Sequence, residues 1–487
     1  MSKRASGVLM HITSLPTPGG TGTLGREAYD FVDRLKRAGF GIWQVLPVGL
    51  TGYGDSHYQS ASVHAGNPLM IALKVLKDEG LLDVIPERRA PTHDEMKQVK
   101  MQGLRLSFNK SFDKLRWVVS AFISEHPGLG DYALFMAIKD YFGGKSWTEW
   151  PDESIRIRQE SAIKEYTRLL RENVDFYEYV QYLFYRQWGK LRTYANSNGI
   201  KIMGDMPIYV AEDSADCWAN PEIFQLDADR RPVKVAGVPP DYFSSDGQLW
   251  GNPLYNWKAL RKRHFDWWLD RFTTADELFD IVRLDHFIGF ANYYAVKAGA
   301  KTARIGKWEK APGFALFKLV NKNLPELKIV AEDLGVVSRR VKRLLRYCGY
   351  PGMRVLQFGF NSIEENPHFI HNIVPNCVLY SGTHDNDTAK GWWADLDEET
   401  RELFTLNMPD GVTVSESMIQ AALESPADIA IVPMQDILGL GKEARMNVPG
   451  TVGGSNWLWR MEEGAFTEQL IDDLRYINDF SGRSNDD

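Results

Sequence analysis

IVRLDHFIG, residues 281–289, is a short apolar run that ends abruptly in charged residues. Because side chains alternate between the two faces of a β-strand, Arg283 and Asp285 share one face while Val282 and Leu284 share the other. Apolar residues on both faces are typical of a strand in a parallel sheet covered by helices, where a charged group is tolerated at the end that meets solvent or a ligand. The stretch therefore predicts a buried parallel strand with Asp285 at its carboxyl end.

Seven further runs have the same character and are separated by helical or long connecting segments. They lie at residues 7–12, 41–47, 200–207, 327–335, 352–358, 377–387 and 429–436. Eight short strands in this arrangement are typical of an α/β protein with a (β/α)₈ (TIM) barrel. A doubly wound open sheet would carry a glycine-rich phosphate loop directly after its first strand, and the GGTG at residues 19–22 lies too far along the chain to serve as one.

The connecting segments predict how the barrel is elaborated. We expect one (β/α)₈ catalytic domain over residues 1–487, with a mostly helical insertion subdomain at residues 69–198, after the second strand. Residues 235–257 have no regular pattern, and long irregular segments are often functional, so we expect an active-site cover loop there, over the C-terminal face of the barrel. A helix is expected from about residue 257 to residue 273.

The composition excludes several classes of function. The formal net charge is −7, from 57 basic and 64 acidic side chains without a long block of one sign, so there is no electrostatic case for nucleic acid or an anionic membrane as a partner. The chain has no apolar leader and no apolar run of about 18 residues, which predicts a cytoplasmic protein. Cys217, Cys348 and Cys377 lack the spacing of a disulfide framework or a thiolate zinc site.

Four acidic residues, Asp205, Asp285, Glu332 and Asp385, lie at or just after the ends of predicted strands. The carboxyl ends of all barrel strands meet at one rim, so these acids are expected to converge there. Arg283 favours the ionised form of Asp285, although a salt bridge that only fixes the strand end explains that pair equally well. Four neighbouring carboxylates repel one another, so their convergence at one rim indicates a functional role.

Two kinds of chemistry would explain these acids. A magnesium site, as in enolate-forming barrel lyases, is disfavoured because Arg283 and His384 already compensate the acids and the second strand ends without a basic Lys. Glycosidase chemistry needs one carboxylate ionised as nucleophile and another protonated as general acid. Asp285 is suited to the first role because it lies beside Arg283. Glu332 is suited to the second because apolar residues precede it in the strand. Asp385 is suited to bind sugar hydroxyls next to the reacting carbon.

Three stretches, RLDHF at 283–287, AEDLG at 331–335 and GTHDND at 382–387, resemble the catalytic motifs of the amylomaltase family (glycoside hydrolase family 77). Its members are 4-α-glucanotransferases, also called disproportionating enzymes. The resemblance extends over nearly the whole chain, through TGYGDS at 51–56, GDMP at 204–207, VPPDYFS at 238–244, QLWGNP at 248–253 and ARMNVPGT at 444–451.

The resemblance implies Asp285 as nucleophile, Glu332 as acid/base and Asp385 as the third carboxylate. The resemblance also implies substrate-binding roles for Arg283, His384, Asp205, Gln248, Trp250, Ser56 and Tyr58. The same role is expected for Tyr242 and Tyr53, because they lie in irregular loops. His57 stands where the family pattern has Pro, and residues 453–457 form a variant of its C-terminal rim loop. His11, His64 and His264 are expected to be structural or solvated, and Trp267 and Trp268 to lie in the core.

The expected activity is therefore a retaining 4-α-glucanotransferase that needs no cofactor or metal. Its expected partners are α-1,4-glucan donors and acceptors, such as maltooligosaccharides, starch or glycogen chains. An α-glucan hydrolase remains a rival within the same chemistry, because the sequence does not decide how well water competes for the intermediate. A non-catalytic glucan-binding protein is a rival from another class, but binding neutral sugar needs no acid/base pair.

Overall fold

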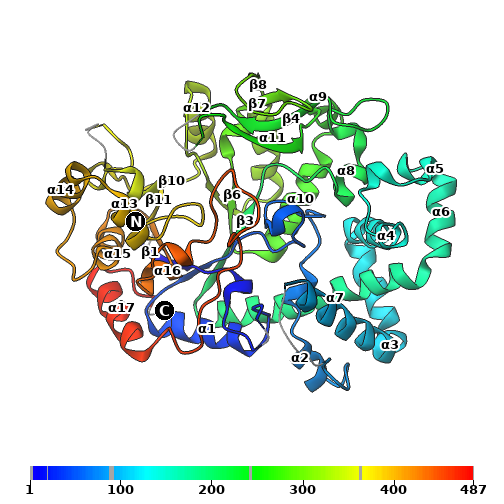
Figure 1. Ribbon diagram of the computed structural model, residues 1–487, viewed down its shortest axis with the longest axis horizontal. Helices are drawn as coiled ribbons and strands as arrows, with labels where there is room; N and C mark the ends of the chain where they lie inside the picture. The colour runs from blue at the N-terminus through cyan, green and yellow to red at the C-terminus, as the bar shows by residue number, and fades with distance from the viewer. Residues whose placement is uncertain (1–3, 19, 87–92, 241–243, 361–364, 486–487) are drawn as a thin grey trace.

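Eight parallel strands close into a barrel in the computed structural model, which describes residues 4–18, 20–86, 93–240, 244–360 and 365–485 (Figure 1). The order around the barrel is β1-β12-β11-β10-β9-β6-β3-β2. The strands are β1 (Ala5–Leu9), β2 (Ile42–Gln44), β3 (Lys201–Met206), β6 (Ile281–Leu284), β9 (Lys328–Ala331), β10 (Gly352–Val355), β11 (Cys377–Tyr380) and β12 (Ile429–Pro433). Each lies mostly or wholly within a predicted run, so the (β/α)₈ barrel is confirmed.

The alternation of side chains along each strand divides the core in two. Ile281, like Met203 and Val330 on neighbouring strands, packs in one cluster formed mainly by barrel strands. Val282 and Leu284 belong instead to the large cluster that the strands form with the surrounding helices. Arg283 therefore shares the face of Ile281, and the alternation directs its side chain toward the barrel interior.

Helices surround the barrel, as a (β/α)₈ architecture requires (Figure 1). Those outside the connection between β2 and β3 are α1 (Arg26–Arg37), α8 (Ala215–Ala219), α9 (Trp257–Lys262), α10 (Asp266–Leu278), α11 (Gly313–Asn323), α12 (Arg339–Cys348), α13 (Ala389–Asp395), α14 (Glu398–Asn407), α15 (Val414–Glu424), α16 (Met434–Ile437) and α17 (Glu468–Phe480). Trp267 and Trp268 are buried on α10, as predicted. Within the described ranges, no helix is both long and apolar enough to cross a lipid bilayer.

A group of helices lies between β2 and β3, on the right of Figure 1. It consists of α2 (Leu73–Asp78), α3 (His93–Glu125), α4 (Pro127–Tyr141), α5 (Glu153–Arg156), α6 (Glu160–Leu169) and α7 (Arg171–Ser197). The long helix α7 ties this group to the barrel, since the indole N–H of its Trp188 donates to the carbonyl of Leu278, 2.8 Å away.

Two details of the prediction are wrong. Residues 235–257 are not irregular throughout, because they contain most of β4 (Lys234–Val238) and all of β5 (Gln248–Pro253). These strands form an antiparallel sheet, in the order β5-β4-β7-β8, with β7 (Asn292–Lys297) and β8 (Gly306–Lys310). The predicted single helix at 257–273 is two helices, since His264 and Phe265 adopt left-handed backbone conformations with φ of 55° and 57°.

Candidate active site

Arg283 organises the acids at the centre of the barrel rim. Strand register places it directly beside Asp205, on β3. Its Nη1 lies 2.8 and 2.7 Å from the two carboxylate oxygens of Asp205 and 3.0 Å from Oδ1 of Asp285. Charge-assisted hydrogen bonds of this kind hold all three side chains in fixed relative positions. Arg283 thus binds both Asp205, whose side chain is fully buried, and Asp285, whose side chain is 26% exposed.

A tyrosine completes the surroundings of Asp205. The Tyr58 hydroxyl donates to Oδ2 of Asp205 over 2.8 Å, and its ring stacks on His384 with 5.2 Å between ring centroids. Burial raises the pKa of the Asp205 carboxyl, and the Arg283 guanidinium acts in the opposite direction. Burial likewise raises the pKa of Tyr58 well above its ordinary value, so its hydroxyl remains a hydrogen-bond donor. Asp205 is therefore held from two sides.

Glu332 follows β9 directly and has a different environment. Its Oε2 accepts a hydrogen bond from the backbone N–H of His286 and its Oε1 one from that of Leu334, both over 2.7 Å. The left-handed backbone at His286, with φ of 49°, accompanies the first of these contacts. Burial raises the pKa of Glu332 to about 8, despite the opposing effect of Arg283 and the two N–H donors. At neutral pH this carboxyl is mostly protonated.

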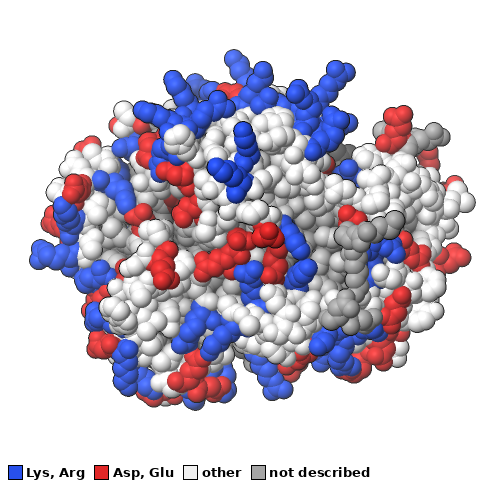
Figure 2. All heavy atoms as spheres, turned by 180° about the vertical axis from the view of Figure 1, so that it is seen from behind, with Lys and Arg blue, Asp and Glu red and all other residues white. Residues whose placement is uncertain are grey.

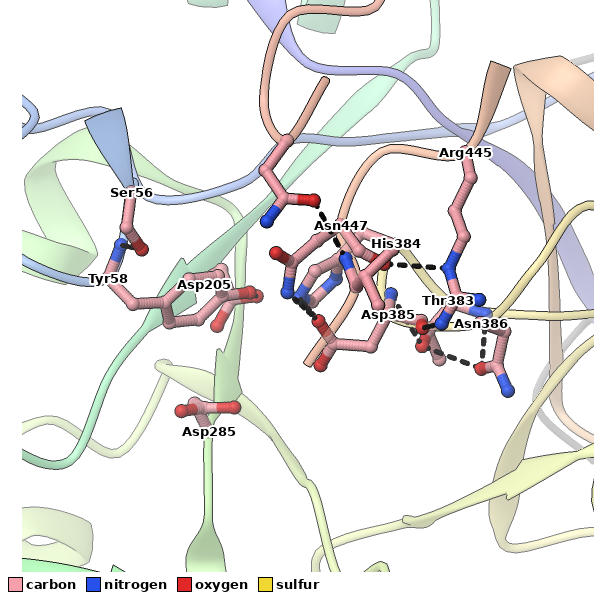
Figure 3. Close-up of polar contacts among 12 residues, drawn as sticks. Ser56, Tyr58, Asp205, Asp285, Thr383, His384, Asp385, Asn386, Arg445 and Asn447 are labelled. Carbon is pink, nitrogen blue, oxygen red and sulfur yellow. Dashed lines mark hydrogen bonds and ion pairs between the residues drawn. The ribbon is translucent and has the colours of Figure 1, made fainter. Parts of the chain in front are cut away.

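Asp385 lies across the open space from Asp285, in the loop after β11 (Figure 3). Its Oδ1 accepts a hydrogen bond from the Asn447 amide over 2.6 Å and lies 3.4 Å from Nε2 of His384. Arg445 donates to the Asp385 backbone carbonyl over 2.6 Å. The side chain is nearly half exposed, so it is fixed in direction but open to a ligand.

The antiparallel sheet brings Gln248 and Trp250 to the same rim. The Trp250 indole N–H donates to Oε1 of Gln248 over 3.1 Å, and the Trp250 ring stands perpendicular to that of His286, 4.9 Å away. An aromatic side chain therefore lies immediately beside the residue that follows Asp285. Such a ring is suited to pack against the apolar face of a sugar.

The three other predicted residues are Ser56, Tyr53 and Tyr242. The Ser56 hydroxyl oxygen accepts a hydrogen bond from the backbone N–H of Tyr58 over 3.2 Å, which positions Tyr58. The backbone at Tyr53 begins a short 3₁₀ helix, Tyr53–Asp55, but its side chain lies outside the described part of the chain. Tyr242 also lies outside the described residues.

Sequence reasoning gave no role to several residues that contact the acids. Asn447 and Arg445 belong to the quoted stretch ARMNVPGT, which was the available signal, but their contacts are with Asp385, 62 and 60 positions away in the chain. His286 contributes through its backbone, which residue type cannot reveal. In the described part of the chain, no group of three or more His, Cys, Asp or Glu side chains is arranged to hold a metal ion.

A layer of rings lies behind Tyr58 and His384. His11 and His57 are both buried, with 4.1 Å between their ring centroids, and His57 lies 5.4 Å from Trp457. Trp457 is in turn 6.0 Å from both Tyr58 and His384. Burial, with a smaller effect of His57, lowers the pKa of His11 well below its ordinary value. His57 therefore packs behind the site rather than in the open space.

Comparisons with known proteins agree with this geometry. The family profile described as 4-alpha-glucanotransferase matches residues 10–467. The chain is 45% identical to a 4-alpha-glucanotransferase of Thermus thermophilus over 96% of each chain, and 42% identical to one of Streptococcus pneumoniae over 100% of this chain and 99% of the other. A solved amylomaltase from Streptococcus agalactiae, in complex with acarbose, superposes with a TM-score of 0.94 at 40% identity and covers 99% of this chain and 100% of its own.

Proposed function

Because this chain belongs to the 4-alpha-glucanotransferase family, glycoside hydrolase family 77, we propose that Asp285 and Glu332 carry out its transfer reaction as nucleophile and acid/base. The observation that carries this assignment is the contrast between their environments. Asp285 lies 3.0 Å from a guanidinium and is open to a ligand, whereas Glu332 is buried and has a pKa of about 8. One is suited to attack and the other to donate a proton.

The first step forms a covalent intermediate. Glu332 donates its proton to the glycosidic oxygen as Asp285 attacks the anomeric carbon, which breaks the glycosidic bond and gives a β-linked glucosyl-enzyme. The reducing-end portion of the donor leaves. Arg283 balances the charge of the free Asp285 carboxylate, and its second contact, with Asp205, keeps it in place after that charge is lost.

The second step transfers the bound glucan. The ionised Glu332 takes the proton from the 4-hydroxyl of an acceptor glucan as that oxygen attacks the anomeric carbon and Asp285 leaves. Asp385, held by Asn447, is suited to bind sugar hydroxyls close to the reacting carbon, where hydrogen bonds strengthen in the transition state. We expect Tyr58, His384, Gln248 and Trp250 to make further contacts with the donor sugar.

The proposed partners are maltooligosaccharides and starch or glycogen chains. Acarbose in the related Streptococcus agalactiae amylomaltase supports a sugar ligand for the same barrel. A cytoplasmic location is proposed on the sequence alone.

Incubation of the purified protein with maltotriose, followed by separation of the products by size, tests the proposal. We expect glucose together with a ladder of oligosaccharides longer than the substrate. Glucose and maltose alone, with a matching rise in reducing ends, would instead identify a hydrolase. An unchanged substrate that still binds would identify a glucan-binding protein.

A further inference from the structure

One part of the surface of this acidic protein carries an excess of positive charge. The chain as a whole carries −7, but between Lys297 and Arg346 thirteen Lys and Arg residues stand against four Asp and Glu residues. Two of those four acids, Glu332 and Asp333, are buried. We define the basic face as the exposed cations of the β7–β8 hairpin and of α12, namely Lys297, Lys301, Arg304, Lys307, Lys310, Arg339, Lys342, Arg343 and Arg346.

The hairpin and α12 form one surface. The Asn292 amide donates to the hydroxyl of Ser338, the N-cap residue of α12, over 3.1 Å. The Arg340 guanidinium donates to the carbonyls of Ala291 and Ala311, which flank the hairpin, over 3.0 and 2.9 Å. Figure 2 shows Lys and Arg gathered along the upper edge of the molecule, where Figure 1 places β7, β8 and α12.

Most cations of the basic face have no acidic partner within the described ranges. Arg304 pairs with Asp246, but among the residues that the structure describes no carboxylate lies within 4.0 Å of the other eight. Glu309, between Lys307 and Lys310, is bound instead by Lys234 and by the Tyr293 hydroxyl. In the helical group the pattern is opposite, since Lys74, Lys164 and Lys190 each pair with a carboxylate.

Exposed aromatic and apolar groups lie among these cations. Trp308, on the edge strand β8, is 47% exposed, and Ile305 at the tip of the hairpin is 87% exposed. Alternation along β8 places Trp308 on the same face as Lys310. A flat indole on the same face as the Lys310 ammonium group is suited to a ligand that has both sugar rings and negative charge.

We propose that the basic face is a second glucan-binding surface, outside the catalytic rim, for α-glucans that carry phosphate monoesters. A phosphate monoester carries about −1.5 to −2 charges at pH 7 and offers three acceptor oxygens to Lys and Arg. A neutral glucan would offer no negative charge to the eight cations that lack an acidic partner among the described residues. The proposal rests on the α-glucan activity, which is what favours a glucan over a nucleic acid as the polyanion.

Co-sedimentation with insoluble phosphate-bearing amylopectin, compared with the same material after phosphatase treatment, tests the proposal. We expect the protein to bind the phosphorylated material at least about fivefold more tightly, and we expect that preference to disappear in 0.5 M salt because exposed charges are then screened. The triple variant Lys310→Glu/Arg339→Glu/Arg343→Glu should lose the preference. Trp308→Ala should weaken binding to both materials.

A matched control is Lys74→Glu/Lys164→Glu/Lys190→Glu, which changes the net charge equally on the helical group. It should retain the preference for phosphorylated glucan. Both triple variants should produce the wild-type ladder from maltotriose, so a failure of catalysis is distinguishable from a failure of this surface. Equal binding before and after phosphatase treatment would overturn the proposal. So would loss of the preference in the control, or tighter binding to single-stranded DNA than to the phosphorylated glucan.

Discussion

The ends of strands β6 and β9 carry carboxyl groups of opposite character. At the end of β6, Asp285 lies 3.0 Å from Arg283 and its side chain is partly open. At the end of β9, Glu332 is buried and bound by two backbone N–H groups, and burial raises its pKa to about 8. The two strands are direct neighbours in the barrel. Environment, rather than residue type, thus separates a candidate nucleophile from a candidate proton donor.

Removing the β6 carboxylate should have the largest effect. The variant Asp285→Asn keeps the size and shape of the side chain but loses the nucleophile, so we expect turnover of maltotriose to fall by about 10⁴-fold or more. Initial rates and thermal unfolding measure activity and folding separately. Asp270→Asn, on the outer helix α10, is the matched control and should keep wild-type activity. Activity of Asp285→Asn within tenfold of wild type would contradict the assignment.

Removing the β9 carboxyl should have a smaller effect that depends on the leaving group. In Glu332→Gln we expect turnover of maltotriose to fall about 10²- to 10⁴-fold, because the glycosidic oxygen is no longer protonated. The fluoride of an α-maltosyl fluoride donor leaves without a proton donor, so this donor should restore formation of a covalent maltosyl-enzyme in Glu332→Gln but not in Asp285→Asn. Mass spectrometry of the intact protein detects the intermediate. Equal rescue of both variants would remove the distinction between the two strand ends.

The pH dependence of kcat/KM for the wild-type enzyme should reflect the protonation of Glu332. Since a protonated Glu332 is needed in the first step, kcat/KM should fall above about pH 8, by about tenfold per pH unit. The stability of the folded protein should also decrease as the pH rises, but over a lower pH range. The folded state keeps this proton up to about pH 8 and the unfolded state releases it near 4.5, so stability is lost as the pH rises between these values. The free energy of unfolding, measured with denaturant over this pH range for wild type and for Glu332→Gln, tests this, because the variant lacks the titrating group. The same pH dependence in both proteins would contradict the raised pKa.

Weakening the support of the β6 end should have a moderate effect. Tyr58→Phe removes the donor to Asp205, one of the two carboxylates that Arg283 binds. We expect kcat/KM for maltotriose to fall about tenfold, in line with the loss of a hydrogen bond to a charged group. The pH at which kcat/KM begins to fall, which is assigned to Glu332, should not change, because Tyr58 does not contact Glu332 in the described structure. A change in this pH would show that the two strand ends are coupled through Tyr58.

Changing the ring layer behind the site should have the smallest effect. His57→Pro restores the residue that the family pattern has before Tyr58 and removes ring contacts with His11 and Trp457. Since His57 packs behind the site, we expect less than about a threefold change in kcat and a change mainly in KM for maltotriose against longer oligosaccharides. A loss of kcat beyond tenfold would place His57 in the catalytic machinery.

The predictable part of the fold was the barrel, because its strands are buried on both faces and therefore read as apolar runs. The strands β4 and β5 were missed because KVAGV and QLWGNP carry Gly, Pro and polar residues, and their pairing includes a partner, β7, more than 50 positions away. The break between α9 and α10 was missed because His264 and Phe265 have left-handed backbone, which non-glycine residues adopt only rarely.

At the site, the acids were predictable and most of their partners were not. Strand alternation was enough to place Arg283 beside Asp285. The contact with Asp205 depends on the register between β3 and β6, and the contacts of Tyr58 and Asn447 depend on loops that approach from distant parts of the chain. A single sequence carries no direct record of such long-range neighbours.

The sequence by itself determined the barrel, its order of elements and the set of carboxyl groups at its rim, because these follow from local periodicity and from the geometry shared by all such barrels. Only the tertiary structure decided that one guanidinium binds both Asp205 and Asp285, that Glu332 is buried deeply enough to hold its proton near neutral pH, and that eight cations of the basic face lack a described acidic partner. Hydration and charge pairing depend on which side chains meet across the chain, and folding alone brings them together.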